Sequence, residues 1–434
     1  MTSKIVVNNI EPDAGISTVS ILGIATATKF IGDIEGGVTG NVTGNVTGSS
    51  GSCTGNAATA TVASGITTTA SVNTSGIVTA TAFIPTTGQL SHRNKVINGA
   101  MNVAQRNMPI TSANGYCLDM FKLWDGMDSG VATVDQSTHS PDGFSKSFKV
   151  DVTTADTSLA ATDYARIHHR IEAQNLQDLA YGTSEAKNIV ISFYVRSTTT
   201  GTYVFSIEQS DNSNKHCVFN YTVNSANTWE RKTFSIAGDT AGVINDDNGY
   251  GFTMYWILAA GSNYSSGSTR STWTAKVTAD SMAGQSVNLF SNTSNEFFLT
   301  GVQLEVGTVV TPFEHRSFSD ELSRCQRYYQ QYVNPCCTGV IPDNGSKAYS
   351  IGLQFQKRMR AVPTLSITNA GTGGNVSDGQ STQFISTLNA ADRNLDGASI
   401  YLNLAGDLGD FRPACLGLND STTNSTTYKF TAEL

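Results

Sequence analysis

Apolar and polar residues alternate along the middle of the chain, and this period-two pattern predicts β-strands. Turn-forming clusters at Thr198–Gly201, Asp211–Asn214 and Asn245–Gly249 separate the predicted strands. Many short strands of this kind predict an antiparallel sandwich or jelly roll over residues 92–317. The apolar faces of the strands are Ile189, Ile191, Phe193 and Val195; Tyr203, Phe205 and Ile207; Cys217, Phe219, Tyr221 and Val223; Phe252, Met254, Trp256 and Leu258; and Phe298, Thr300, Val302 and Leu304.

The period changes to that of a helix near residue 319, and a connecting helix is predicted over 318–335, from about Ser319 to Val333. Asp320 and Arg324 have the i, i+4 spacing of a helical ion pair, and Pro335 ends the pattern. Two interpretations remain open: a helix that packs on a sheet, or a short coiled junction between three chains. One stripe of the helix consists of Leu322, Cys325, Tyr329 and Tyr332.

Alternation returns after Pro335 and predicts a separate, β-rich terminal tip domain over 336–434. Its apolar faces are Tyr349, Ile351, Leu353 and Phe355; Ile400, Leu402 and Leu404; and Tyr428 and Phe430.

The region before residue 92 has a different character. Residues 36–91 contain no charged side chain, and Gly40, Gly44 and Gly48 recur within the unit Val-Thr-Gly-Asn. The segment Gly23–Ile31 matches Gly76–Ile84 in the pattern Gly-Ile-x-Thr-Ala-Thr-x-Phe-Ile. Such repeats favour an extended β shaft over 23–91 whose valines are buried between identical chains. Residues 1–22 are expected to form a short extended anchor.

Composition narrows the class of protein. A chain of 434 residues is long enough for two or three domains. The net charge of −8 and the pI near 5.2 argue against a nucleic-acid binder. No apolar run approaches the roughly 18 residues of a membrane span, so we expect a soluble protein without membrane insertion. The seven cysteines show no C-x-x-C spacing, which favours free thiols made in a reducing cytoplasm.

Four segments of the chain together resemble bacteriophage tail fibres, especially those of marine cyanobacterial phages. The resemblance spans nearly the whole chain, and it implies a homotrimeric adhesive fibre on the virion, assembled in the host cytoplasm, with jelly-roll-like, carbohydrate-binding-type domains toward its distal end. It also implies that residues 1–22 attach to a tail or baseplate protein of the virion. The segments are Ser3–Ile10 with Ile16–Val19; the repeat Gly-Ile-x-Thr-Ala-Thr-x-Phe-Ile; Asn94–Arg106; and Leu299–Gly307 with Thr311–Ser317 and Glu321–Tyr329.

Glycan recognition is the chemistry that the polar loops favour. Sugars present apolar faces and hydroxyl edges, which suit aromatic rings beside Asn, Asp and Gln side chains. The polar loop 260–273 holds two aromatic residues, although Trp273 is also interpreted as a core residue of the next strand. The predicted receptor-binding residues are Asn263, Tyr264, Trp273, Asp343, Asn344, Asn369 and Asn375.

Other candidate chemistry is weaker. His168 and His169 lie in an alternating stretch, so their rings point to opposite faces and cannot easily chelate one metal ion. The pair Cys336-Cys337 is interpreted as structural thiols, and Asp246-Asp247 as part of a turn rather than as the two carboxylates of a glycosidase. We therefore expect no metal, no cofactor and no enzymatic activity.

The favoured hypothesis is a phage tail fibre that adheres to a polysaccharide of the host cell surface. In a parallel trimer anchored by its N-terminus, the terminal domain 336–434 is expected to determine which host is bound. One alternative is a purely structural capsid or neck fibre without a receptor. Another is a tailspike that depolymerises polysaccharide.

Overall fold

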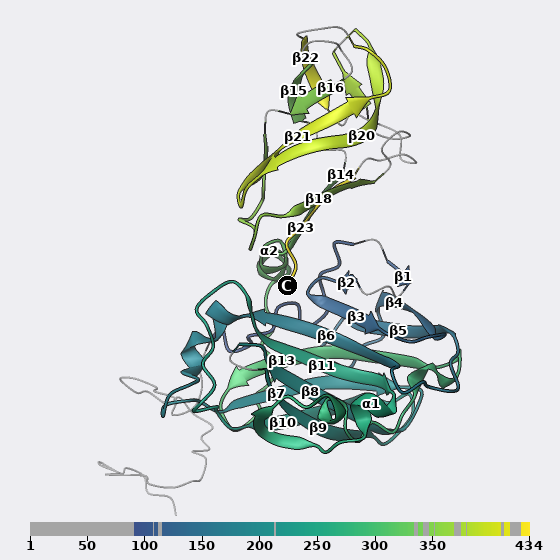
Figure 1. Ribbon diagram of the computed structural model, residues 1–434, viewed down its shortest axis with the longest axis vertical. Helices are drawn as coiled ribbons and strands as arrows, with labels where there is room; N and C mark the ends of the chain where they lie inside the picture. The colour runs from purple at the N-terminus through teal and green to yellow at the C-terminus, as the bar shows by residue number, and fades with distance from the viewer. Residues whose placement is uncertain are drawn as a thin grey trace, which may run out of the picture. The chain divides into compact units, whose positions relative to one another are not determined.

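The chain folds into antiparallel β-sheets, and the all-β class predicted from the alternation is confirmed (Figure 1). The predictions for residues 1–22 and for the shaft up to residue 90 lie outside the described residues. The computed structural model describes residues 91–106, 108–111, 115–211, 214–333, 337–341, 347–350, 352–368, 375–378, 380–408, 412–416 and 427–434.

Two sheets, which we name A and B, form a sandwich within residues 110–306. Sheet A has the order β1 (Ile110–Thr111), β4 (Val131–Ser137), β5 (Ser147–Thr154), β13 (Glu296–Val306), β7 (Ile189–Ser197) and β10 (Glu230–Ile236). Sheet B has the order β12 (Arg270–Ala275), β9 (Lys215–Val223), β8 (Gly201–Gln209), β11 (Tyr250–Ala260), β6 (Tyr164–Glu172), β3 (Phe121–Asp125) and β2 (Tyr116–Leu118). The strands predicted from the apolar faces correspond to β7, β8, β9, β11 and β13.

Short helical turns connect the strands of the sandwich. They are η1 (Ala173–Leu179), α1 (Ser262–Ser265), η2 (Thr278–Asp280) and η3 (Leu289–Ser291).

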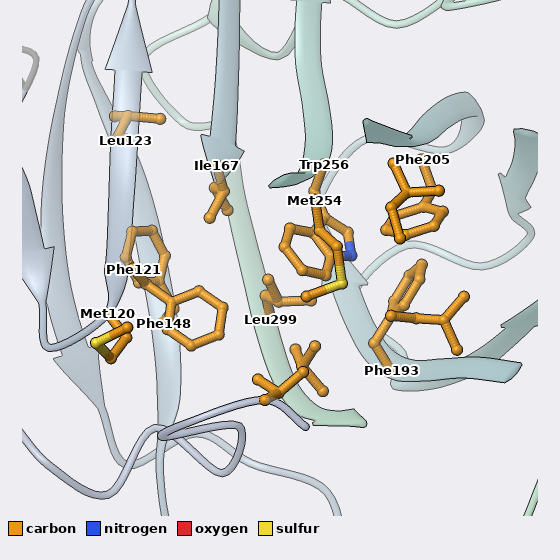
Figure 2. Packing of buried hydrophobic residues seen from close by; sticks show 14 of the residues in the cluster. Met120, Phe121, Leu123, Phe148, Ile167, Phe193, Phe205, Met254, Trp256 and Leu299 are labelled. Carbon is orange, nitrogen blue, oxygen red and sulfur yellow. The ribbon is translucent and has the colours of Figure 1, made fainter. Parts of the chain in front are cut away.

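Aromatic side chains fill the space between sheets A and B (Figure 2). Trp256 of sheet B meets Phe193 of sheet A edge-on, with ring centroids 5.6 Å apart, and it lies 5.5 Å from Phe205. All three side chains are fully buried. Full burial of such large rings stabilises the fold by about 2–3 kcal/mol for each residue. In β7, β8, β9 and β11 the inward positions are the predicted apolar residues. The prediction is wrong for the first half of β13, where Phe297 and Leu299 point inward in place of Phe298 and Thr300, because a register shift after Thr300 changes the alternation.

The predicted helix is correct at its start and wrong at its end. The helix α2 spans Phe318–Cys325, begins at the cap residue Ser317, and contains the expected ion pair between Asp320 and Arg324, at 3.3 Å. The chain then forms the strand β14 (Tyr329–Val333), which pairs with β23 near the C-terminus. Residues rich in tyrosine and valine suit a pleated sheet, and a partner strand distant in the sequence overrides the helical spacing.

The terminal strands form two further sheets, C and D, whose cores share one apolar cluster that includes Ile400, Leu402, Tyr428 and Phe430. Sheet C has the order β14, β23 (Thr427–Thr431) and β18 (Thr364–Thr368). Sheet D has the order β16 (Lys347–Ser350), β15 (Cys337–Ile341), β22 (Arg412–Leu416), β19 (Asn375–Ser377), β20 (Thr382–Arg393), β21 (Gly397–Leu404) and β17 (Leu353–Gln354).

Candidate functional site

The predicted loop residues Asn263 and Tyr264 lie in α1. Asn263 is exposed, and its backbone N–H donates to the carbonyl of Ala161 at 3.0 Å. The ring of Tyr264 meets the ring of Tyr164 edge-on, with centroids 5.1 Å apart. Both tyrosines pack against a small apolar cluster formed by Val204, Val218, Tyr255, Ile257 and Met282. This cluster lies on the face of sheet B that points away from sheet A, which we call the outer face of sheet B.

Trp273 packs on the opposite side of sheet B from Tyr264. Its ring stacks on Phe252 with centroids 5.5 Å apart, and its indole N–H donates to the carbonyl of Ala237 at 3.0 Å. It also meets Tyr181 edge-on and joins the interior cluster between the sheets. The structure therefore does not bring Tyr264 and Trp273 into one site. Trp273 has the contacts of a core residue, as its second interpretation predicts.

The predicted site residues of the terminal region are only partly within the described residues. Asp343, Asn344 and Asn369 lie outside them, and Asn375 is described only as a backbone partner of Phe384 in sheet D. A cavity of about 420 Å³ lies beside β17 and the turn between β20 and β21. Its lining includes Gln354, Asp392, Arg393, Asn394 and Asp396, and none of the predicted residues.

A group of basic and aromatic side chains that the sequence prediction missed lies on the outer face of sheet B. Strand β6 places every second residue there, and the register aligns Lys122 of β3 and Tyr255 of β11 on either side of His168. Trp124 aligns with Arg166 in the next outward row. We call this group the cationic face; its members are Tyr116, Lys122, Trp124, Tyr164, Arg166, His168, Arg170 and Tyr255.

Each cation of this face lies over an aromatic ring. The Arg166 Cζ atom is 4.3 Å from the ring centroid of Tyr255 and 5.4 Å from that of Trp124. The Lys122 Nζ atom is 4.3 Å from the Trp124 centroid. The Arg170 Cζ atom is 4.4 Å from the centroid of Tyr250, which is at the start of β11. Cation–π attraction holds these side chains over the sheet, at about 0.5–2 kcal/mol for each pair.

The nearby carboxylates have other partners. Glu208 accepts from the Lys276 ammonium at 2.7 Å and from the Tyr255 hydroxyl at 3.2 Å. Glu172, the last residue of β6, forms an ion pair with Arg327 at 2.7 Å. Within the described part of the chain, Lys122, Arg166 and Arg170 form no ion pair with a carboxylate. The charge of Glu433 also reaches Lys122, but Glu433 is paired with Arg106. None of the three cations is therefore in direct contact with a carboxylate of the described residues.

The two adjacent histidines differ in their surroundings. His169 points inward, where its Nδ1 lies 3.1 Å from the Met120 carbonyl oxygen and its ring packs on Phe121. His168 points outward and meets Trp124 edge-on, with centroids 5.4 Å apart. Burial first, and then the charges of Arg170 and Arg166, lower the pKa of His168 well below its usual value. The prediction that the two rings point to opposite faces is confirmed.

The cationic face leads into a small pocket of about 180 Å³ next to α1. Arg166 and Tyr164 form one side of the pocket, and Tyr264 and Lys276 form another. Tyr264, predicted as a glycan-binding residue, therefore adjoins the cationic face, although the prediction did not connect it with Arg166.

The outer face of sheet A offers an internal reference. There Phe298 lies beside two cations, with the Arg196 Cζ atom 4.7 Å and the Lys149 Nζ atom 6.0 Å from its ring centroid. Glu296 contacts both cations, Lys149 at 2.7 Å and Arg196 at 3.9 Å. On sheet A, the cations beside the aromatic ring are therefore also paired with a carboxylate.

No group of three or more His, Cys, Asp or Glu side chains in the described part of the chain is placed to hold a metal ion. No helix found there is long and apolar enough to cross a membrane.

Comparison with known proteins gives matches at the level of structure only. No family model and no curated protein matches the chain. Among solved structures, a tailspike protein 4 domain of bacteriophage CBA120 is 12% identical, with 49% of this chain and 21% of that chain covered and a TM-score of 0.26. A putative sugar binding protein from Bacteroides thetaiotaomicron is 13% identical, with 49% and 100% covered and a TM-score of 0.30.

A family 11 carbohydrate-binding module of Clostridium thermocellum is 10% identical, with 48% of this chain and 99% of that chain covered and a TM-score of 0.25. The chain thus spans about a fifth of the tailspike chain and nearly all of the two sugar-binding proteins. At such identities and TM-scores the likeness carries no functional argument, and the function has to be argued from the residues of the chain.

Proposed function

We propose that the chain is a phage fibre protein that adheres to bacteria by binding a surface glycan, and that the sandwich binds the glycan without cleaving it. The location on the virion, the homotrimer and the attachment through residues 1–22 belong to this proposal and are supported by the sequence resemblance. The observation that carries the glycan-binding part is the cationic face.

The cationic face has the groups that sugar recognition requires. Half-exposed rings at Trp124 and Tyr164 offer apolar surfaces for the faces of a sugar. The guanidinium groups of Arg166 and Arg170 offer fixed N–H donors for its oxygen atoms. Sheet strands hold both kinds of group, so their geometry is set before a ligand arrives and little ordering is needed on binding.

The carboxylates beside this face favour binding over hydrolysis. Glycoside hydrolysis uses two carboxyl groups that flank the scissile bond, one of them free to give a proton. Glu208 is engaged by Lys276, and Glu172 by Arg327. Both therefore serve the internal charge balance of the protein.

Binding of the full-length chain to an array of purified bacterial surface polysaccharides tests the proposal. We expect at least one polysaccharide to bind, and Trp124→Ala to weaken that binding roughly tenfold by removing a stacking surface. Trp229→Ala is the matched control, because Trp229 is also half-buried but contacts Phe298 on sheet A. Thermal unfolding of both variants checks that each remains folded.

Two outcomes would contradict the proposal in different ways. Failure to bind any polysaccharide, with the protein folded, would favour a purely structural fibre. Release of reducing ends from a bound polysaccharide would show a depolymerase. The expectation that residues 336–434 choose the host stays a prediction, and exchange of this segment between fibres of different hosts tests it by adsorption.

A further inference from the structure

We infer that the cationic face selects acidic glycans and binds their carboxylate groups at Arg166 and Arg170. The inference rests on the proposed function and names the chemical class of its ligand. Three features of the face support it: the donors that the arginines keep free, the balance of charge, and the spacing of the cations.

Each arginine contacts an aromatic ring and still has hydrogen-bond donors without a partner. The Arg166 Cζ atom lies 4.3 Å from the ring centroid of Tyr255, and the Arg170 Cζ atom lies 4.4 Å from that of Tyr250. The Nε atom of each arginine is buried and has no hydrogen-bond partner among the described residues, so a ligand can reach only the terminal guanidinium nitrogens. A carboxylate binds an arginine in the guanidinium plane, often through two parallel hydrogen bonds. The terminal nitrogens of Arg166 and Arg170 are therefore the donors that a carboxylate meets.

The balance of charge favours an anionic ligand. Lys122 lies near Arg166 and Arg170, and burial first, followed by the charge of Arg170, lowers the pKa of Lys122. Cations placed this closely repel one another, and an anion bound between them relieves the repulsion. Glu208, Glu172 and Glu433 do not supply that anion, because each is already paired with another cation.

The spacing favours a polymer over a single small anion. Arg166 and Arg170 occupy alternate outward positions of β6, four residues apart, which corresponds to about 13 Å between their Cα atoms. Lys122 lies opposite His168, between the two arginines. A row of cations with this extent matches a chain that carries a carboxylate on successive sugar units. The pocket at Arg166 and Tyr264 can hold one sugar ring or a substituent at the end of the row.

Binding of the full-length chain to paired polysaccharides tests the inference. The probes are polygalacturonate, alginate and hyaluronate, each beside its carboxyl-reduced form, which has the same backbone without the charge. We expect at least one acidic form to bind at least tenfold more tightly than its reduced form, and the affinity to fall as salt is raised. Arg166→Gln and Arg170→Gln should each weaken binding about tenfold. Arg196→Gln on sheet A, whose cation is already paired, should change it less than twofold.

The outcomes separate the inference from the proposed function. Equal binding of the acidic and reduced forms, or binding of neutral polysaccharides alone, would overturn the inference and leave glycan binding standing. Equal binding of polyglutamate or of duplex DNA would show a surface for polyanions in general and would also overturn it. Failure of all acidic forms would overturn it, and the polysaccharide array would then decide the proposed function. Circular dichroism of each variant confirms that a loss of binding is not a loss of fold.

Discussion

The outer faces of sheets A and B carry the same kinds of group in different balance. On sheet A, Lys149 and Arg196 flank Phe298, and Glu296 contacts both cations. On sheet B, Lys122 and Arg166 flank Trp124, and neither is paired with a carboxylate among the residues described. A cation over an aromatic ring is therefore not by itself evidence for a binding site in this protein. The informative difference is the carboxylate that sheet A has and the cationic face lacks.

The two faces also differ in their aromatic residues. Sheet B gathers Trp124, Tyr164 and Tyr255 around a single arginine, Arg166. On sheet A, Trp229 and His139 meet the ring of Phe298 edge-on, but Arg196 lies over Phe298 alone. Several rings around one cation make a platform for a sugar. The unpaired cations and the rings around Arg166 thus both favour the cationic face as the binding surface.

The largest expected loss of stability comes from truncating a core side chain between sheets A and B. Trp256→Ala should destabilise the fold by about 3–5 kcal/mol, because Trp256 is fully buried between Phe193 and Phe205. Urea unfolding followed by circular dichroism measures the change. Trp229→Ala, a half-buried tryptophan outside the core, should cost about 1 kcal/mol or less. Equal effects of the two substitutions would contradict the placement of the core.

The second effect is a loss of stability at low pH from His169, the buried histidine on the inward side of β6. Burial lowers the pKa of His169 to about 3. The unfolded chain, with a histidine pKa of about 6.5, binds more protons below that pH, so stability falls as pH drops from 6.5 toward 3. At pH 5 the loss from His169 amounts to about 2 kcal/mol.

The pH dependence can be checked with His169→Phe, whose ring can still pack on Phe121. The variant should lose part of the slope of unfolding free energy between pH 6.5 and 4, whatever its stability at pH 8. An unchanged slope would mean that folding does not lower the pKa of His169. His168→Phe should also flatten the slope, because the pKa of His168 is lowered as well.

The sequence predicts the faces of the strands but not their neighbours. Alternation in Tyr164–Glu172 places Arg166, His168 and Arg170 on one side, and the structure confirms this. The assembly of the cationic face also depends on β3 and β11, which lie on either side of β6 although distant in sequence. That pairing order arises from long-range contacts, so no local pattern indicates that Trp124 and Tyr255 meet Arg166.

The predicted helix 318–335 and the predicted binding loop 260–273 also depend on contacts with residues that are distant in the sequence. Helical spacing is satisfied through Tyr332, but the partner strand β23 is about a hundred residues away, and its pairing converts Tyr329–Val333 into a strand. In the loop 260–273, composition predicts polar recognition, yet Trp273 turns inward to Phe252 and Tyr264 outward to Tyr164. Residue types indicate which chemistry is available, and tertiary contacts decide which residues share a site.

The smallest expected effect on stability comes from removing the carboxylate that pairs with the cations of sheet A, which leaves that face more like the cationic face of sheet B. Glu296→Gln removes the carboxylate between Lys149 and Arg196 while keeping its size. Although burial opposes it, the hydrogen bond and charge of Glu296 raise the pKa of Lys149. These groups are partly exposed, so the loss of stability should be about 1 kcal/mol or less. Urea unfolding measures it, with Glu185→Gln, an exposed carboxylate with no ion pair among the described residues, as control.

The same substitution tests whether unbalanced charge is sufficient for binding. In a background of Arg166→Gln and Arg170→Gln, where the cationic face is disabled, Glu296→Gln should restore weak polyuronate binding. Arg196 then has no carboxylate partner among the described residues, and Lys149 keeps only Asp151, at 3.3 Å. We expect a gain of a few-fold over the background, corresponding to about 1 kcal/mol. If no binding returns, removal of the carboxylate is not sufficient, and the three rings around one cation, Arg166, are needed as well. If binding returns in full, the rings contribute little, and the face acts through charge alone.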